Sequence, residues 1–324
     1  MAEEELYFSP SPHIKSKTTV PWVMRQVFLA LLPAAVGSGY FFGFRYVFPS
    51  ILISILACLG FETLDCLIFK KPLTIYDGSA LVTGMLLGLS LPPGSPFWIA
   101  LVGSGAAIIL GKQMFGGLGQ NIFNPALVGR AVLLISWPKA MTTWMARPPF
   151  ALLPGAEGAE VVTTATPLTI NQMNGFPFLQ ELDPQILKHL FLGQVPGSIG
   201  ETSVLLLLLG FLYLLWRGVV SWHIPLTFFG GLSLVVLLGG ESLFFHLLAG
   251  GAIMGGCFMA TDYVTSPMTR RGQLIFGLGA GAITGIIRLL GNYPEGVTFG
   301  ILIMNATVPL LDRILPPQFG GEKR

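Results

Sequence analysis

The sequence has 324 residues, of which 52% are hydrophobic and only 10% are charged. This composition lies outside the range of soluble globular proteins and is typical of proteins that cross a membrane several times. Because the formal net charge is only +2, the chain has no basic face large enough to bind nucleic acid, and its Lys and Arg residues are better used to predict topology.

Residues 1–21 are predicted to form a short cytoplasmic tail. They include Glu3, Glu4 and Glu5 and contain no apolar run before the first predicted span. They therefore lack the basic start and the hydrophobic segment of a cleaved signal peptide.

Apolar runs of roughly 15 to 22 residues predict an all-α polytopic membrane protein with about ten transmembrane helices. The predicted spans are 22–43, 46–67, 79–91, 97–111, 125–138, 203–216, 223–239, 244–260, 274–290 and 296–311. Several of them, including the third and the fifth, are too short for a straight crossing. Tryptophans lie at or near span ends, as in the aromatic belt of membrane helices: Trp22, Trp98, Trp137, Trp216 and Trp222.

The positive-inside rule orients these spans. With a cytoplasmic N-terminus, twelve of the 18 Lys and Arg residues lie in inside segments and five in outside segments. Three of those five lie in the one long loop, where the rule weakens. Arg130 is left within the fifth span. The sequence thus predicts cytoplasmic N- and C-termini, a C-terminal tail at 313–324 and a large outer-face loop at 139–202, with one helix near 183–193.

The two membrane parts, 22–138 and 203–312, resemble each other weakly at an offset of 174 residues. Pro93 aligns with Pro267, and glycines at 103, 105, 111 and 117 align with those at 277, 279, 285 and 291. Because each part holds five predicted spans, an odd number, the two would have opposite orientations. The sequence therefore predicts two inverted five-helix repeats related by a pseudo-two-fold axis in the membrane plane. Glycines spaced by four residues, such as Gly84 and Gly88, favour close helix packing.

A glycine-rich loop at 116–119 leads into a predicted helix start, with Asn124 as N-cap and Pro125 at the first helical position. It lacks the third spaced glycine and the preceding strand of a Rossmann or P-loop nucleotide site. Its backbone N–H groups, the Asn121 and Asn124 amides and the intramembrane Arg130 fit an anion or the edge of an isoalloxazine ring. They also fit simple capping and packing of the helix itself.

Several charged residues give weaker signals. Asp262 precedes an Arg pair at 270–271 in a polar cytoplasmic connector, where it fits an internal ion pair, a topology determinant or a partner contact. Glu62, Asp65 and Glu241 lie near span ends and are predicted to be interfacial.

The cysteines and histidines indicate no metal centre. Cys58, Cys66 and Cys257 show no metal-ligand spacing and are predicted to pack in the core, and the four histidines form no cluster. No catalytic residue and no metal site are predicted in this chain.

The outer loop contains a hydroxyl cluster at 163–166. Thr166 precedes Pro167, which favours extended backbone geometry, and follows the small Ala165. A modifying enzyme could therefore reach its hydroxyl and esterify it to a flavin phosphate, which would tether an electron carrier to the chain. On the residues alone, an ordinary Thr-rich loop is the simpler interpretation.

Seven short motifs follow one another along nearly the whole chain. They are DGSALVTG at 77–84, FGGLGQN at 115–121, FNPA at 123–126, FMATD at 258–262, TSPMT at 265–269, YPEGV at 293–297 and MNA at 304–306. Together they resemble the RnfD family, the D subunits of the Rnf ion-translocating electron transport complex. That family is related to the B subunits of the Na⁺-translocating NADH:quinone oxidoreductase.

The resemblance implies a covalent flavin in the outer loop. In that family an acid, two spacer residues and Ser/Thr-Gly-Ala-Thr mark the attachment of FMN through its phosphate to the last Thr. Here Glu160 is followed by Thr163, Thr164, Ala165 and Thr166, with Glu in place of the usual Asp and Thr164 in place of Gly. The resemblance therefore implies a phosphoester between FMN and Thr166, made by a flavin transferase.

The resemblance also implies a fold like the inverted repeats of urea transporters, and a second, non-covalent flavin, riboflavin, near Asn121 and Asn124. It implies a subunit of an ion-translocating ferredoxin:NAD⁺ oxidoreductase in the bacterial inner membrane, with the 139–202 loop in the periplasm. Electron transfer would drive Na⁺ or H⁺ movement, and the complete active site would need the other Rnf subunits. The alternatives are a component like the B subunit of the quinone reductase and a urea-transporter-like channel without a redox role.

Overall fold

The computed structural model describes residues 18–146, 162–164, 166–169, 184–201, 203–291 and 296–316. Within these ranges the protein is helical apart from a two-stranded antiparallel ribbon. In chain order the elements are α1 (Val20–Phe42), α2 (Phe44–Ile68), η1 (Ile75–Asp77), α3 (Ser79–Ser90), α4 (Phe97–Gly105), η2 (Ala106–Leu110), η3 (Gln113–Phe115), α5 (Pro125–Ser136), α6 (Pro138–Met141), β1 (Trp144–Ala146), β2 (Val162–Thr164), α8 (Pro184–Leu192), α9 (Val204–Trp216), α10 (His223–Leu238), α11 (Leu243–Leu248), α12 (Ala252–Met254), η4 (Gly255–Met259), α13 (Arg270–Leu290) and α14 (Val297–Ile314).

Helices lie within each of the apolar runs found in the sequence, and α8 confirms the helix predicted in the outer loop. By length and composition, five stretches of the described chain can cross a membrane: Val20–Phe42, Phe44–Ile68, Phe97–Phe115, Arg270–Leu290 and Val297–Ile314. The shorter apolar helices are α3, α5, α9 and α10. Large apolar side chains such as Leu56 of α2 and Leu234 of α10 stay exposed, as lipid contact requires. The chain is therefore a helical, multi-pass membrane protein.

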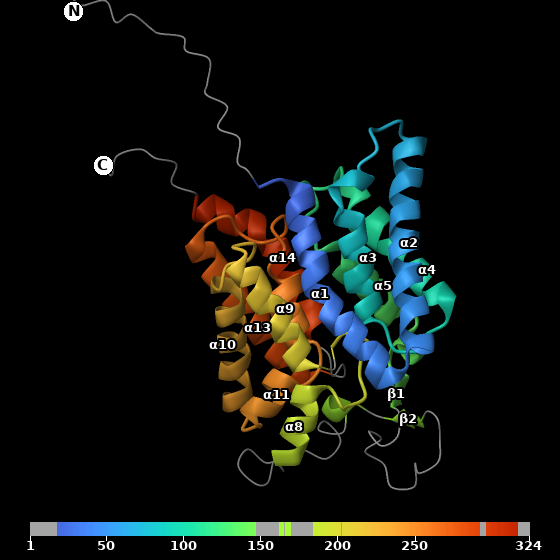
Figure 1. The fold of residues 1–324 in the computed structure, drawn as a ribbon. Coiled ribbons are helices and arrows are strands. Elements are labelled where there is room, and N and C mark those ends of the chain that lie inside the picture. Colours follow the sequence, from blue (N-terminus) through green and yellow to red (C-terminus); the bar gives the residue numbers. More distant parts are fainter. Residues whose placement is uncertain are drawn as a thin grey trace, which may run out of the picture.

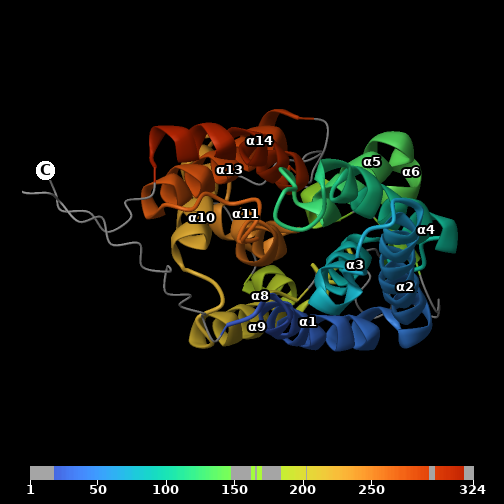
Figure 2. The same cartoon turned by 90° about the horizontal axis from the view of Figure 1, so that it is seen from above.

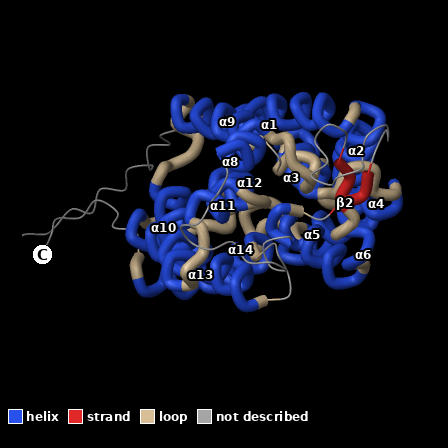
Figure 3. The backbone as a smooth tube through the Cα atoms, turned by 90° about the horizontal axis from the view of Figure 1, so that it is seen from below, coloured by secondary structure: helices blue, strands red, loops and turns tan. Residues whose placement is uncertain are grey.

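Figure 2 shows the helices grouped into two flanks joined along one edge. Helices α2, α3, α4 and α5 form one flank, and α10, α13 and α14 form the other. Helices α1 and α9 lie side by side along the joining edge. Helix α1 begins and α14 ends on the same face of the molecule, whereas α8 lies at the opposite face (Figure 1), together with the β1–β2 ribbon (Figure 3). The height of the helical bundle thus separates α8 and the ribbon from the start of α1 and the end of α14.

The eighth predicted span, 244–260, is interrupted rather than continuous. Helix α11 ends at Leu248, and Gly250, with a φ of 62°, turns the chain before α12 begins at Ala252. Arg288 of α13 closes the break, because its guanidinium donates to the His246 carbonyl at 2.6 Å and to the Ala249 carbonyl at 3.1 Å. A side chain thereby satisfies carbonyls that the broken helix leaves without intrahelical partners.

Glycines bring α3 against α2, as their spacing predicted. A Cβ at Gly84 would lie 2.6 Å from Ile55 Cα, and one at Gly88 would lie 2.9 Å from Ile51 Cα. The cysteines also behave as predicted, because all three are free and buried.

Helices α10 and α13 approach still more closely. A Cβ at Gly281 of α13 would overlap the Phe228 carbonyl oxygen, and a Cβ at Gly231 of α10 would overlap the Leu278 carbonyl oxygen. The two helices therefore touch through backbone at these points, which only residues without a side chain allow.

Gly231→Ala is expected to destabilise the protein, with the neighbouring Gly230→Ala as matched control, since a Cβ at Gly230 has nothing within 4 Å. The first change should lower the free energy of unfolding by about 1–3 kcal/mol through overpacking. The second should be neutral or stabilise by up to about 1 kcal/mol through helix propensity. Thermal unfolding in detergent, followed by tryptophan fluorescence, measures both. Equal midpoints would show that α10 and α13 do not cross at Gly231.

Candidate functional site

Thr166, the predicted attachment residue, is buried on the face of the protein that carries α8, with 6% of its surface exposed. Its Oγ1 lies 2.9 Å from the Thr169 hydroxyl oxygen and accepts the Thr169 backbone N–H at 3.2 Å. The side chain thus caps a single helical turn at 167–169. The turn holds the hydroxyl in one direction.

The rest of the predicted motif is placed only in part. Strand β2 pairs antiparallel with β1, with Thr163 opposite Met145 and Thr164 opposite Trp144. The side chains of Thr163 and Thr164, and the whole of Glu160 and Ala165, lie outside the described residues.

Thr166 lines a small cavity of about 20 Å³, called the outer cavity from here on. The other walls come from α8, the end of α11, Gly250 and the loop at 195–201. Leu168 docks the segment, because it is buried against an apolar cluster made of Leu190, Val195, Phe245 and Ala249. A Cβ on Gly250 would lie 2.6 Å from Leu168 Cδ1, so the Leu168 side chain packs against the backbone of Gly250, where the helix is broken. Apolar packing two residues downstream therefore positions the Thr166 hydroxyl.

Arg130, the intramembrane arginine of α5, pairs with a carboxylate that sequence reasoning did not single out. Its Nη1 donates to Glu201 Oε1, and its Nη2 lies 3.3 Å from Ser198 Oγ. The Ser198 hydroxyl donates to Glu201 Oε2 at 2.8 Å, and all three side chains are buried. Pairing offsets the large cost of placing a charge inside a membrane. Glu201 and Ser198 also line the outer cavity, so the carboxylate of this ion pair lies in the wall of the same cavity as Thr166.

A second cavity, called the inner cavity, opens between α1, α3, α5, α9 and the connector that follows η4. It has a volume of about 70 Å³, within about 700 Å³ of unfilled space that includes its open mouth. Val82, Leu86 and Phe258 are among its apolar walls, and its polar lining is Ser79, Thr83, Lys112, Asn121, Asn124, Thr261, Asp262 and Tyr263. A mostly apolar pocket with a few convergent polar groups is typical of a small-molecule site.

The two asparagines predicted near this site play different parts. Asn124 is the N-cap of α5, as predicted: its Oδ1 accepts from Ala126 N and Leu127 N, and its Nδ2 donates to the Met259 carbonyl at 3.0 Å. Asn121 donates to the Phe123 carbonyl at 3.1 Å, but its buried Oδ1 accepts no hydrogen bond. Asn121 therefore offers a free acceptor to a ligand, whereas Asn124 is fully used by the fold.

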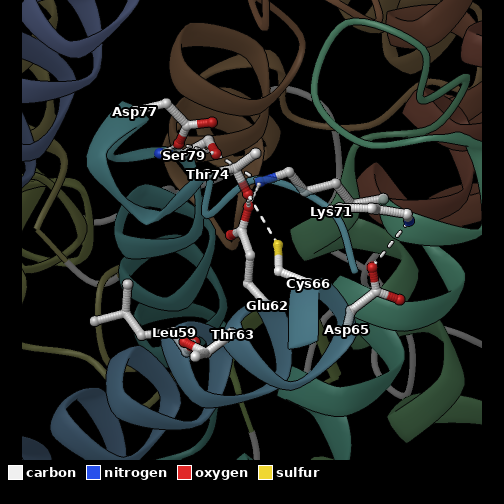
Figure 4. Close-up of polar contacts among 10 residues, drawn as sticks. Leu59, Glu62, Thr63, Asp65, Cys66, Lys71, Thr74, Asp77 and Ser79 are labelled. Atoms are coloured by element: carbon white, nitrogen blue, oxygen red, sulfur yellow. Dashed lines mark hydrogen bonds and ion pairs between the residues drawn. The ribbon is translucent and has the colours of Figure 1, made fainter. Parts of the chain in front are cut away.

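A buried charged cluster around Glu62, Thr74 and Ser79 (Figure 4) borders the inner cavity, whose lining includes Ser79 and Lys112. Lys112 Nζ lies 2.6 Å from Glu62 Oε1 and 2.6 Å from Ser79 Oγ, and Thr74 donates to the same glutamate oxygen at 2.5 Å. The prediction that Glu62 is interfacial is wrong, because the residue is fully buried. Its partner Lys112 is 50 residues away in sequence, so the position of Glu62 near a span end gave no sign of the pair.

The remaining charged residues lie closer to expectation. Asp65 pairs with the partly exposed Lys71 at 3.0 Å, as an interfacial residue can. Glu241 Oε2 lies 3.9 Å from His246 Nε2. Asp262 accepts a hydrogen bond from Thr265 at 3.0 Å rather than pairing with the arginines at 270–271, and desolvation raises the pKa of its carboxyl. Among the described residues, no three His, Cys, Asp or Glu side chains come together as a metal site would require.

Similarity to known proteins extends over nearly the whole chain. Residues 7–321 match the NQR2, RnfD, RnfE family. The chain is 45% identical to the D subunit of the proton-translocating ferredoxin:NAD(+) oxidoreductase complex of Clostridium ljungdahlii, over 98% of this chain and 96% of that protein. It is 42% identical to the D subunit of the Na(+)-translocating ferredoxin:NAD(+) oxidoreductase complex of Acetobacterium woodii, over 99% and 97%. Identity to the D subunit of the ion-translocating oxidoreductase complex of Stutzerimonas stutzeri is 40%, over 94% and 93%.

Lys112→Met is expected to destabilise the protein by about 3–5 kcal/mol, because it leaves the Glu62 carboxylate buried without its counter-charge. Adding Glu62→Leu should recover most of this loss, since an apolar pair needs no compensation. Lys71→Met, which breaks the partly exposed pair with Asp65, is the control and should cost less than about 1 kcal/mol. Thermal unfolding in detergent compares the variants. A single Lys112→Met variant as stable as the control would contradict the buried pair.

Proposed function

The chain belongs to the NQR2, RnfD, RnfE family, and on this premise we propose that it is the D-type membrane subunit of an ion-translocating ferredoxin:NAD⁺ oxidoreductase complex of the Rnf type. The resemblance read from the motifs is confirmed at the level of the family. The near full-length identity to two such subunits, 45% and 42%, carries the proposal. One of these relatives is named for protons and the other for Na⁺, so the proposal covers either ion.

In this proposal the chain crosses the inner membrane ten times as two inverted five-helix repeats. The helices found in all ten apolar runs support it, as does the contact between α1 and α9, the first helices of the two parts. The N- and C-terminal tails lie in the cytoplasm, and the loop at 139–202 lies in the periplasm. The start of α1 and the end of α14 lie on the opposite side of the molecule from α8, which agrees with this topology (Figure 1).

The outer cavity is the proposed place of a covalent FMN. The Thr166 hydroxyl on the cavity wall can carry the phosphoester, and a flavin transferase would make the bond. At about 20 Å³ the cavity is too small for an isoalloxazine ring, so the ring would lie toward its mouth and not inside it. When bound, FMN supplies one- and two-electron transfer, while the protein supplies position and electrostatics. Ferredoxin and NAD⁺ chemistry belongs to the other subunits of the complex.

The inner cavity is the proposed place of a non-covalent riboflavin. The pyrimidine edge of an isoalloxazine carries an N–H donor, which the unpartnered Asn121 Oδ1 can accept. The apolar walls fit the rest of the ring, and Ser79 and Lys112 offer polar groups to the ribityl chain. The tricyclic ring would fill the open mouth as well as the enclosed volume.

Thr166→Ala is expected to abolish covalent flavin on the protein, since the phosphoester needs this hydroxyl. The full-length chain, co-expressed with a flavin transferase, should fluoresce on a denaturing gel, and intact-mass spectrometry should show an FMN-sized addition. Thr169→Ala is the matched control: it removes the hydrogen-bonding neighbour of Thr166 but leaves the attachment hydroxyl in place, so the addition should persist. A wild-type chain without any covalent flavin would refute the redox role and favour the channel.

Asn121→Leu is expected to weaken riboflavin binding by about tenfold to a hundredfold, because a buried hydrogen-bond acceptor is lost. Acid extraction and chromatography give the riboflavin retained per chain. Gln120→Leu is the control, since this exposed neighbour does not line the inner cavity. Equal riboflavin contents in the two variants would remove Asn121 from the site, while covalent FMN should be unchanged in both.

A further inference from the structure

A third cavity, called the rim cavity from here on, lies where α4 begins and α5 ends. Its walls are the loop at 92–96, Trp98 and the segment 136–140, with Thr143 just before the β1–β2 ribbon, so it lies on the ribbon's face of the molecule (Figure 3). Its volume is about 550 Å³, against about 70 Å³ for the inner cavity and about 20 Å³ for the outer cavity. A cavity of this volume is large enough for a small-molecule ligand. Three of the five residues at 92–96 are prolines, whose fixed backbone makes this wall rigid.

Two tryptophans place the rim cavity at the edge of the membrane. Trp98 and Trp137 both line it and pack edge to face, with their ring centroids 5.3 Å apart. Tryptophans at the ends of membrane helices favour the depth of the lipid headgroups. Beside them, Phe97 and Ile135 have 68% and 64% of their surface exposed, and α4 lies at the outer edge of its flank (Figure 2). The cavity is therefore bordered by apolar side chains that lipid acyl chains can cover.

The charge of the rim cavity is positive. Lys139 is the ionisable side chain among the described residues that line it, and no carboxylate lies among them. The side chain of Lys139 is exposed, and the ion pairs of the described chain use other cations. Helix α4 begins at this cavity with Pro96 as N-cap, so its first turn has no side-chain cap and contains no acidic residue. With the exposed Ser136 hydroxyl as a further donor, the lining complements a group with negative charge and several acceptor oxygens, such as a phosphate.

We propose that the rim cavity binds the headgroup of an anionic phospholipid of the outer leaflet. Lys139 pairs with the phosphate, Ser136 donates a hydrogen bond to the headgroup, and the acyl chains cover Phe97 and Ile135. These two exposed apolar side chains favour a lipid over a soluble phosphate compound, which would leave them in water. The proposal uses the proposed topology only to name the leaflet. It does not involve the flavin, so either proposal can fail without the other.

The test is a titration of the full-length chain in detergent with phosphatidylglycerol whose acyl chains are brominated and quench tryptophan fluorescence on contact. Phosphatidylcholine brominated in the same way is the comparison, because its headgroup has no net charge. In the wild type, phosphatidylglycerol should reach half-saturation at a concentration about tenfold lower, as one charge-assisted contact provides. Lys139→Gln should remove this difference. Lys188→Gln, an equally exposed lysine on α8 that does not line the rim cavity, is the matched control and should keep it.

A second variant tests the cavity itself. Ser136→Phe fills it while leaving Lys139 in place, so it should also weaken phosphatidylglycerol binding, and the exposed position of Ser136 makes folding of this variant secure. Equal half-saturation by the two lipids in the wild type, or an unchanged preference in both Lys139→Gln and Ser136→Phe, would overturn the proposal. Displacement of phosphatidylglycerol by an equal concentration of inorganic phosphate would overturn it too, because the site would then be one for soluble phosphate.

Discussion

The structure depends on one constraint, the high free-energy cost of an unpaired charge in a membrane. In the described part of the chain, two buried ion pairs avoid this cost: Lys112 with Glu62 and Arg130 with Glu201. Each joins segments at least 50 residues apart in sequence. Each also borders a cavity, the first the inner cavity and the second the outer one. The two buried ion pairs of the described chain therefore both lie at the walls of its cavities.

The same constraint applies to the backbone wherever a membrane helix is interrupted. Arg288 donates to carbonyls at the break between α11 and α12, and Asn124 satisfies both the start of α5 and the end of η4. Asn305 of α14 completes this inner network by accepting from Asn124 N at 3.3 Å and donating to the Thr265 carbonyl at 2.8 Å. Side chains from neighbouring helices thus replace the hydrogen bonds that short or broken helices cannot make themselves.

What could be predicted from the sequence was set by local signals. Apolar runs located the helices, and Asn124 before Pro125 marked a helix start, because both signals act within a few residues. Glu62 was predicted to be interfacial, and Glu201 was not singled out. Their partners come from other parts of the chain, so no local sequence pattern indicates either ion pair. The burial of Thr166 was equally hidden, because it depends on Leu168 meeting the helix break at Gly250. Assignment of the hydroxyl to flavin chemistry came from the family resemblance rather than from residue properties.

The contact between Leu168 and Gly250 bears on how this protein can vary over evolutionary time. It fixes the hydroxyl-bearing turn to the membrane helices, so the position of Thr166 is inherited from the bundle and not from the length of the loop around it. A change of loop length on either side of 166–169 therefore need not move Thr166. A side chain at Gly250, which is remote in sequence from the motif, would instead press on Leu168 and so on the turn that carries Thr166. In the proposed function, the placement of the flavin would therefore depend on a glycine that lies outside the attachment motif.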